Sequence, residues 1–144
     1  MFSVKIYGAG SIGNHFAFAF RKRKWTVTVF DVDKKALLRM KNDIYPSRYG
    51  KWDSKINLSN KDDKLYYDLI LIGTPPDTHL KIANKILKDS PPKLLHIEKP
   101  FCTPDFKNLS SFLEILKKTR TQVIGGYNHT LTKNTKLAEK ILKK

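Results

Sequence analysis

The chain has 144 residues, 40% of them hydrophobic, which is enough for one domain with a continuous core but not for two. Its one cysteine, Cys102, excludes an internal disulfide, and no stretch approaches the roughly 18 apolar residues of a membrane span, so we expect a soluble, cytoplasmic protein with no membrane partner. The formal net charge of +15 favours anionic partners, yet the lysines are scattered along nearly every expected helix, as on an ordinary solvated basic surface.

The first expected element is a strand over residues 2–7 that leads directly into the glycine-rich turn of residues 8–13. In such a turn the first glycine permits a tight change of direction, the second lets the backbone approach a pyrophosphate, and the third lets the next helix pack on the strand. Unpaired N–H groups at the start of that helix would then face the phosphates. The residues predicted to contact a dinucleotide here are Gly8, Gly10, Ser11, Ile12 and Gly13.

Strand-length apolar runs alternate with helical periodicity along the whole chain, and this alternation predicts a parallel sheet covered by helices. The later strands are expected over residues 25–30, 68–73, 93–98 and 121–127, with at most a short strand near residues 56–58. We therefore predict a single α/β domain with a Rossmann-type, doubly wound parallel sheet.

The helices between these strands are marked by apolar stripes and by their expected ends. The basic run at residues 21–24 lies in the last turn of the first helix, where cations suit the helix dipole. The second helix is expected to end at Pro46, and Thr103 is expected to cap the helix before the last strand, with Pro104 at its first position. Residues 45–67 are the least regular part, and no function is readable from them.

An acidic residue lies where a dinucleotide site needs one. Asp31 ends the second strand, roughly 20 residues after Gly8, at the spacing from which a carboxylate hydrogen-bonds the adenosine ribose. Such a carboxylate repels a 2′-phosphate, which favours NAD, but Lys34 and Lys35 are close enough in sequence to offset that repulsion and leave NADP open. The alternative is a turn used only for packing, with Asp31 as a helix cap.

Two further clusters follow buried strands, at the edge where open α/β sheets bind ligands. One is the Gly-Thr-Pro turn at residues 73–75 with His79 downstream, and the other is Glu-Lys-Pro at residues 98–100. Together with the glycine turn, Asp31 and a Gly-Tyr-Asn segment ending at Asn128, they make the chain resemble the nucleotide-binding half of the Gfo/Idh/MocA family of NAD(P)-dependent oxidoreductases. The resemblance covers almost the entire chain.

The resemblance implies roles for individual residues. Lys99 would be catalytic, because the lysine of the family's Glu-Lys-Pro lies near the nicotinamide and assists proton movement at the carbon undergoing hydride transfer. A cis bond between Lys99 and Pro100 is implied as well. The further cofactor contacts implied are Thr74, Pro75, His79, Glu98, Lys99, Pro100 and Asn128. From the residues alone, a packing or capping role for His79 is at least as well supported, and Glu98 would orient the backbone or Lys99.

No metal site is expected, because His15, His96 and His129 share no ligand spacing with one another or with Cys102. Cys102 has no evident histidine partner in the local sequence. It is interpreted as a structural or incidental thiol.

The family's enzymes have a second α/β domain that builds the substrate pocket, and no such domain is recognisable in this sequence. We expect residues 1–127 to form the dinucleotide-binding domain and residues 128–144 to begin a connecting helix toward that absent domain. The leading hypothesis is the NAD(P)-binding domain of an oxidoreductase acting on a small sugar-like or polyol substrate. It would be truncated, or paired with a partner chain that supplies the second domain.

Three alternatives remain at this point. The chain could be a stand-alone dinucleotide-binding or interaction module without catalysis. It could be a methyltransferase, which shares a glycine turn and an acid after the second strand. Nucleic-acid binding through the basic surface is the least favoured, with aromatic side chains interleaved with cations as stacking platforms. The residues of those platforms would be Tyr45, Arg48, Tyr49, Lys51 and Trp52.

Overall fold

Six parallel strands form the centre of the computed structural model, which describes residues 1–127 and 132–142. The strands are β1 (Ser3–Tyr7), β2 (Thr26–Phe30), β3 (Ile56–Ser59), β4 (Leu69–Ile72), β5 (Leu94–Ile97) and β6 (Gln122–Gly125). Their order is β3-β2-β1-β4-β5-β6, and every neighbouring pair is parallel. The chain therefore builds outward from β1 on one side and from β4 on the other, which confirms the doubly wound Rossmann arrangement.

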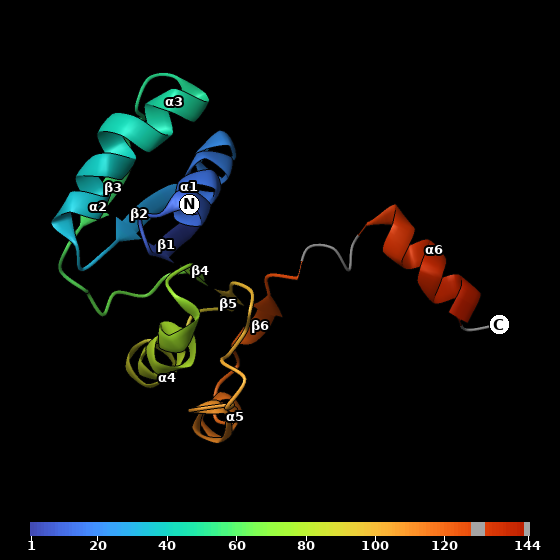
Figure 1. The fold of residues 1–144 in the computed structure, drawn as a ribbon. Helices are drawn as coiled ribbons and strands as arrows, with labels where there is room; N and C mark the ends of the chain where they lie inside the picture. Colours follow the sequence, from blue (N-terminus) through green and yellow to red (C-terminus); the bar gives the residue numbers. More distant parts are fainter. Residues whose placement is uncertain (128–131, 143–144) are drawn as a thin grey trace.

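Alternation along the strands divides the core into two layers. Val4 and Ile6 of β1 face α1 (Ser11–Lys22) and α2 (Lys34–Arg39), while Tyr7 faces α4 (His79–Asp89). Beyond α4, α5 (Leu109–Leu116) contributes the buried Phe112 to the second layer. Figure 1 shows the two groups of helices on either side of the sheet. Because β4 is covered on both faces, it is a continuous apolar run, whereas the edge strand β6 is largely exposed.

The helix after β2 does not end at Pro46, which corrects the expectation from sequence. After α2 the chain makes a π-helical turn, η1 (Met40–Ile44), and continues into α3 (Tyr45–Tyr49). The N–H of Tyr45 bonds to the carbonyl of Met40, and Pro46 then falls in the first turn of α3, where a missing N–H costs least. The helix ends instead at Gly50, whose φ of +81° suits glycine.

Thr103 does not cap α5, which is a second correction. Its hydroxyl bonds to Asp105, and its carbonyl accepts the N–H of Phe106, so this stretch forms a turn of its own. The residue before α5 is Asn108, at a left-handed φ of 68°. Asn tolerates this conformation better than most residues, which places the helix start later than the Thr-Pro pair indicated.

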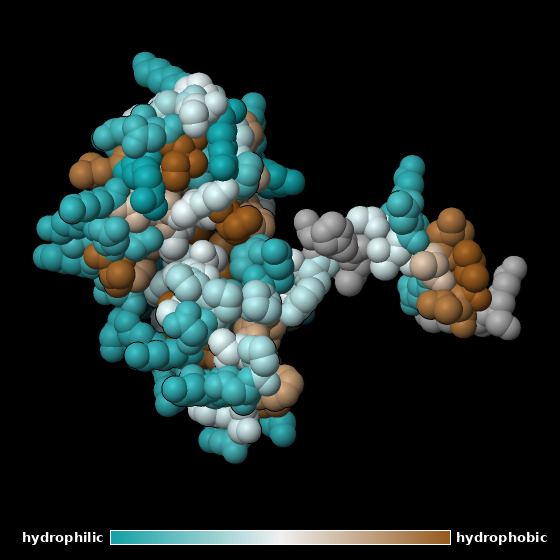
Figure 2. All heavy atoms as spheres, in the orientation of Figure 1, coloured by the Kyte–Doolittle hydropathy of each residue, from teal (hydrophilic) through white to brown (hydrophobic). Residues whose placement is uncertain are grey.

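The last described helix, α6 (Lys133–Leu142), has no buried residue. Its apolar side chains Leu137, Ile141 and Leu142 are 59%, 64% and 85% exposed. Figure 2 shows a hydrophobic face on the helix that Figure 1 labels α6. No helix within residues 1–127 or 132–142 has the length and apolar character to cross a membrane.

Candidate functional site

A cavity of about 490 Å³ opens where β1, β2 and β4 end. Its lining comes from three stretches that are far apart in the sequence: the glycine turn, the end of β2 together with α2, and the turn after β4 together with the start of α4. The site lies between β1 and β4, from which the chain builds outward in both directions, and ligands of open α/β sheets bind at this point. Of the predicted site residues, those that line it are Gly8, Gly10, Asp31, Thr74 and Pro75.

The three glycines of the turn are needed for different reasons. At Gly8, with φ +106°, a Cβ atom would lie 2.8 Å from the carbonyl oxygen of Gly73, and at Gly13 it would lie 2.0 Å from that of Gly8. These two positions are closed by the chain's own backbone. A Cβ atom at Gly10 would meet no atom within 4 Å. The space beside Gly10 is therefore open to a bound group, as a phosphate cradle requires.

The start of α1 faces this space without a cap from the protein. Gly10 is the N-cap, it makes no side-chain hydrogen bond, and no acidic residue lies in the first turn. The first N–H groups of the helix and the positive end of its dipole are thus available to an anion. Ser11 and Ile12 begin this helix, and they sit beside the cavity rather than among its lining residues.

Asp31 ties the glycine turn to the end of β2. Its Oδ2 accepts the N–H of Ala9 at 2.8 Å and its Oδ1 accepts the N–H of Asp33 at 2.9 Å. The cap of α2 is Asp33, which accepts the N–H of Lys35 at 2.8 Å, so Asp31 is not the helix cap. A carboxylate has about four acceptor positions, and Asp31 keeps unused ones while lining the cavity.

His79 connects the two loops at the ends of β4 and β5. Its Nε2 lies 2.7 Å from the carbonyl oxygen of Thr74, and its Nδ1 lies 3.0 Å from that of Pro100. None of its surface is exposed. His79 therefore takes the packing role, and it holds the Thr74 turn against the segment that contains Lys99.

The Glu98-Lys99-Pro100 segment lies next to the cavity but does not line it. The Lys99–Pro100 bond is cis, as the family resemblance implied. Glu98 accepts the backbone N–H of Lys99 at 3.3 Å and contacts Nε2 of His96 at 3.1 Å, so it orients the backbone. The side chain of Lys99 is exposed, and it has no ion pair among the described residues. Asn128 lies outside the described residues.

Arg39 is a site residue that the sequence reasoning missed. It lines the cavity together with Asp31 and Ala36. Ala36 and Arg39 are three residues apart on α2, so they share a helix face, and that spacing was the available signal. A cation thus lies at the same cavity as the carboxylate predicted to bind the ribose.

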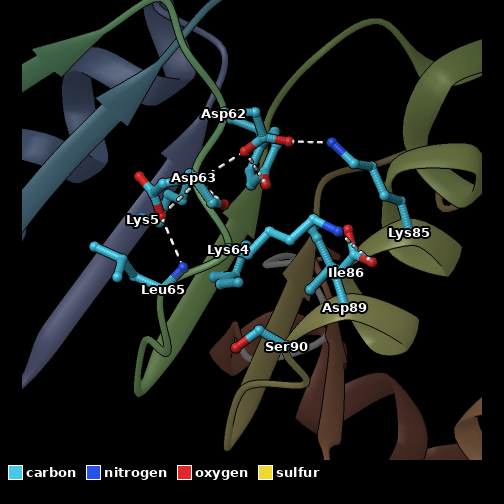
Figure 3. Close-up of a pocket in the computed structure, with 11 residues that line it drawn as sticks. Lys5, Asp62, Asp63, Lys64, Leu65, Lys85, Ile86, Asp89 and Ser90 are labelled. Atoms are coloured by element: carbon cyan, nitrogen blue, oxygen red, sulfur yellow. Dashed lines mark hydrogen bonds and ion pairs between the residues drawn. The ribbon is translucent and has the colours of Figure 1, made fainter.

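A second pocket, separate from this cavity, holds an ion-pair network around the buried Lys5 (Figure 3). Lys5, with 1% of its side chain exposed, reaches from β1 to Asp62 Oδ1 at 2.7 Å and to Asp63 Oδ1 at 3.2 Å. Lys85 of α4 pairs with the other oxygen of Asp62 at 2.5 Å. The hydroxyl of Tyr7 donates to Asp62 at 2.8 Å, and Tyr7 also lines the cavity, so the network fixes its ring there.

The network shifts the acidity of its members. Burial alone would raise the pKa of Asp62, but hydrogen bonds from Lys5, Lys85 and Tyr7 outweigh it, and the pKa lies below its ordinary value. Burial, followed by the negative charge of Asp62, raises the pKa of Tyr7. Asp62 is therefore held as a carboxylate, and Tyr7 as a neutral donor to it.

Of the aromatic side chains predicted as base-stacking platforms, Tyr45 is buried, and Tyr49 and Trp52 are partly buried in ring contacts, which disfavours that interpretation. Tyr45 is 3% exposed, and the ring of Tyr49 is stacked on Phe18 with centroids 3.9 Å apart. Trp52 packs edge-on against Tyr45 at 4.9 Å. Within residues 1–127 and 132–142, no three His, Cys, Asp or Glu side chains form a group that could hold a metal ion.

The doubly wound sheet, the glycine turn and the cavity between them define a nucleotide-binding domain of the Rossmann class. Comparison with protein families identifies it further, because residues 2–127 match GFO_IDH_MocA, described as an oxidoreductase family with an NAD-binding Rossmann fold. The chain belongs to this family. A comparison with curated proteins finds no match.

Solved structures share the fold at low identity. A putative myo-inositol dehydrogenase from Sinorhizobium meliloti is 20% identical with a TM-score of 0.69, over 99% of this chain and 41% of that one. Myo-inositol dehydrogenase from Lactobacillus casei, in complex with NAD(H) and myo-inositol, is 14% identical with a TM-score of 0.74, over 99% of this chain and 41% of that one. The WlbA dehydrogenase from Bordetella pertussis, with NADH and UDP-GlcNAcA, is 14% identical with a TM-score of 0.71, over 98% and 41%. This chain thus spans about two fifths of these neighbours.

Proposed function

We propose that the cavity binds NAD(H), and that the chain is the nucleotide-binding part of an oxidoreductase that transfers a hydride to or from a sugar or polyol. The open space at Gly10 carries this proposal, because nothing in the protein's own packing requires glycine there. The uncapped start of α1 supplies the N–H groups for a pyrophosphate, and Asp31 supplies acceptors for the ribose. When bound, the nicotinamide supplies the hydride chemistry.

The proposed roles of the other residues follow from their positions. Thr74 and Pro75 form the wall of the cavity nearest to the Lys99 segment, and His79 joins the two. The side chain of Lys99 is exposed, and the backbone N–H of Lys99 donates to Glu98. This side chain would give or take a proton at the substrate oxygen as the hydride moves. Because its side chain does not line the cavity, Lys99 acts on the substrate more than on cofactor binding.

The substrate class and the second domain are also proposals. Structural neighbours hold myo-inositol or UDP-GlcNAcA, which supports a polyol or sugar substrate. The family match spans residues 2–127, and α6 has no buried residue among those described, which supports a dinucleotide-binding domain over residues 1–127 with residues 128–144 leading to a second domain. That domain would come from a partner chain or from further sequence.

Calorimetric titration with NADH tests the proposal, and the variant Gly10→Val tests whether NADH binds in the space beside Gly10. The backbone of Gly10 is extended, with φ −80° and ψ −167°, so valine fits without backbone strain and costs the helix start only about 1 kcal/mol. Its side chain would fill the open space, and we expect NADH binding to fall below detection. The matched control is Ser54→Val, because Ser54 is exposed and does not line the cavity.

Each outcome of this titration has a defined meaning. A folded parent chain that does not bind NADH would refute the proposal, and binding of S-adenosylmethionine in its place would favour the methyltransferase alternative. NADH binding that survives in Gly10→Val would place the cofactor somewhere other than this cavity. The unfolding midpoint of each variant shows that the fold is retained.

A further inference from the structure

A second cation, Arg48, lies at the start of α1. It belongs to residues 45–67, for which the sequence indicates no function. Nη1 of Arg48, on α3, donates to Oγ of Ser11 at 2.8 Å and to Nε2 of His15 at 3.1 Å. Ser11 is the first residue of α1, directly after Gly10. The guanidinium is therefore held one residue beyond Gly10, next to the cavity, although neither Ser11 nor Arg48 is among its lining residues.

The position of Arg48 is fixed by packing between two helices. The ring of Tyr49 is stacked on Phe18 of α1 at 3.9 Å, with 3° between the ring planes, and its hydroxyl contacts Nδ1 of His15. The π-helical turn η1 changes the direction in which the residues after it face, and turns of this kind are frequent at functional sites. The aromatic contacts and the turn together direct Arg48 along α1 to Ser11.

The hydrogen bonds leave both side chains with unused donors. Only Nη1 of Arg48 has partners among the described residues, and no ion pair of Arg48 is found there, so Nε–H and the Nη2 hydrogens remain. Because a guanidinium only donates, Ser11 must accept, and the proton of its own hydroxyl is free to point elsewhere. A guanidinium and a hydroxyl group at the start of a helix together favour the binding of an anion.

We propose that Arg48 is a phosphate-binding residue of the dinucleotide site, contacting the cofactor's pyrophosphate directly and orienting the hydroxyl of Ser11 toward it. This rests on the proposed function of the cavity. The glycine turn and α1 supply only neutral N–H groups, and Arg48 adds the charge that they lack. Arg48 thereby belongs to the cofactor site, although it lies outside the motifs on which the family resemblance rests.

Titrations of the parent chain and of Arg48→Ala and Arg48→Gln with NADH, ADP and adenosine test this. Gln keeps a hydrogen bond within reach of Ser11 but has no charge. We expect both variants to bind NADH and ADP about tenfold more weakly, as expected for the loss of a charge-assisted hydrogen bond, and adenosine as the parent does. The control is Arg23→Ala, since Arg23 is also an exposed arginine but lies at the other end of α1.

The outcomes separate this inference from the function on which it rests. Parent-like NADH affinity in Arg48→Ala or Arg48→Gln overturns the role of Arg48 while the cavity remains a dinucleotide site. An equal loss for adenosine overturns it too, because the effect would not depend on phosphate. A folded parent chain that binds no NADH overturns the proposed function itself. Far-ultraviolet circular dichroism checks that each variant folds.

Discussion

Opposite charges meet at one cavity in Asp31 and Arg39. We propose that this pair sets the preference between NAD and NADP. Asp31 already accepts two backbone N–H groups, which holds it as part of the turn and leaves its remaining acceptors for the ribose. Arg39 has no ion pair among the described residues, and Lys34 and Lys35 precede it on α2. The carboxylate favours NAD, while these cations reduce its repulsion of a 2′-phosphate.

Replacing Arg39 by Ala should therefore change the preference between cofactors. We expect NADPH affinity to fall about tenfold, because the cation that faces a 2′-phosphate is lost, and NADH affinity to change by less than about twofold. Fluorescence titrations of both cofactors measure this, with Arg23→Ala as the control. An equal loss of NADH and NADPH would show that Arg39 does not act on the 2′-phosphate.

At the scale of elements, the Lys5 network fastens the segment between β3 and β4 to β1 and α4. The stability of this network depends on charge, since Lys5 is buried and would be left without a charged partner if Asp62 and Asp63 were neutral. The pKa of Asp62 is lowered in the folded state. Its contribution to stability is therefore complete above the unfolded pKa of about 3.9, and is lost as the pH falls through the folded value.

This predicts that Asp62→Asn is less stable than the parent at neutral pH and loses less stability on acidification below about pH 4. At neutral pH, Lys5→Met should lower the free energy of unfolding by about 3 kcal/mol, because it leaves carboxylates without their buried partner. Urea unfolding across the pH range measures both effects. Asp89→Asn is the control, since its partner Lys64 is 74% exposed and the pair contributes little. If the free energy of unfolding of Asp62→Asn fell as steeply with decreasing pH as that of the parent, the role given to Asp62 would be wrong.

The elements also show where sequence reasoning succeeds. The glycine turn and the strands were predicted because their signals are local, in consecutive residues or in short apolar runs. Lys5 gave no such signal, because Asp62 lies 57 residues further along the chain. The helix end expected at Pro46 and the helix cap expected at Thr103 were wrong for a related reason. A π-helical turn and a local Thr103–Asp105 bond override the usual helix ends, and the contact between Arg48 and Ser11 exists only once α3 packs on α1.

At the scale of the whole molecule, the proposed cofactor site and the proposed catalytic lysine lie in two places. The cavity is lined by the glycine turn, Asp31 and Arg39, while Lys99 lies on an exposed segment beside it, with no ion pair among the residues described. The chain spans about two fifths of its structural neighbours, each covered over 41% of its length or less. We therefore propose that Lys99 acts on a substrate that a second domain brings to it.

Lys99→Ala tests this division. We expect NADH affinity to stay within about twofold of the parent, because the lysine does not line the cavity, and turnover of a polyol or sugar substrate to fall by about 100-fold or more once a second domain is supplied. NADH fluorescence measures the first quantity and the rate of NAD reduction the second. Lys93→Ala, an exposed lysine just before β5, is the matched control at the opposite end of the same strand. Unchanged turnover in Lys99→Ala would remove the lysine from the chemistry, whereas lost NADH affinity would make it a cofactor-binding residue instead.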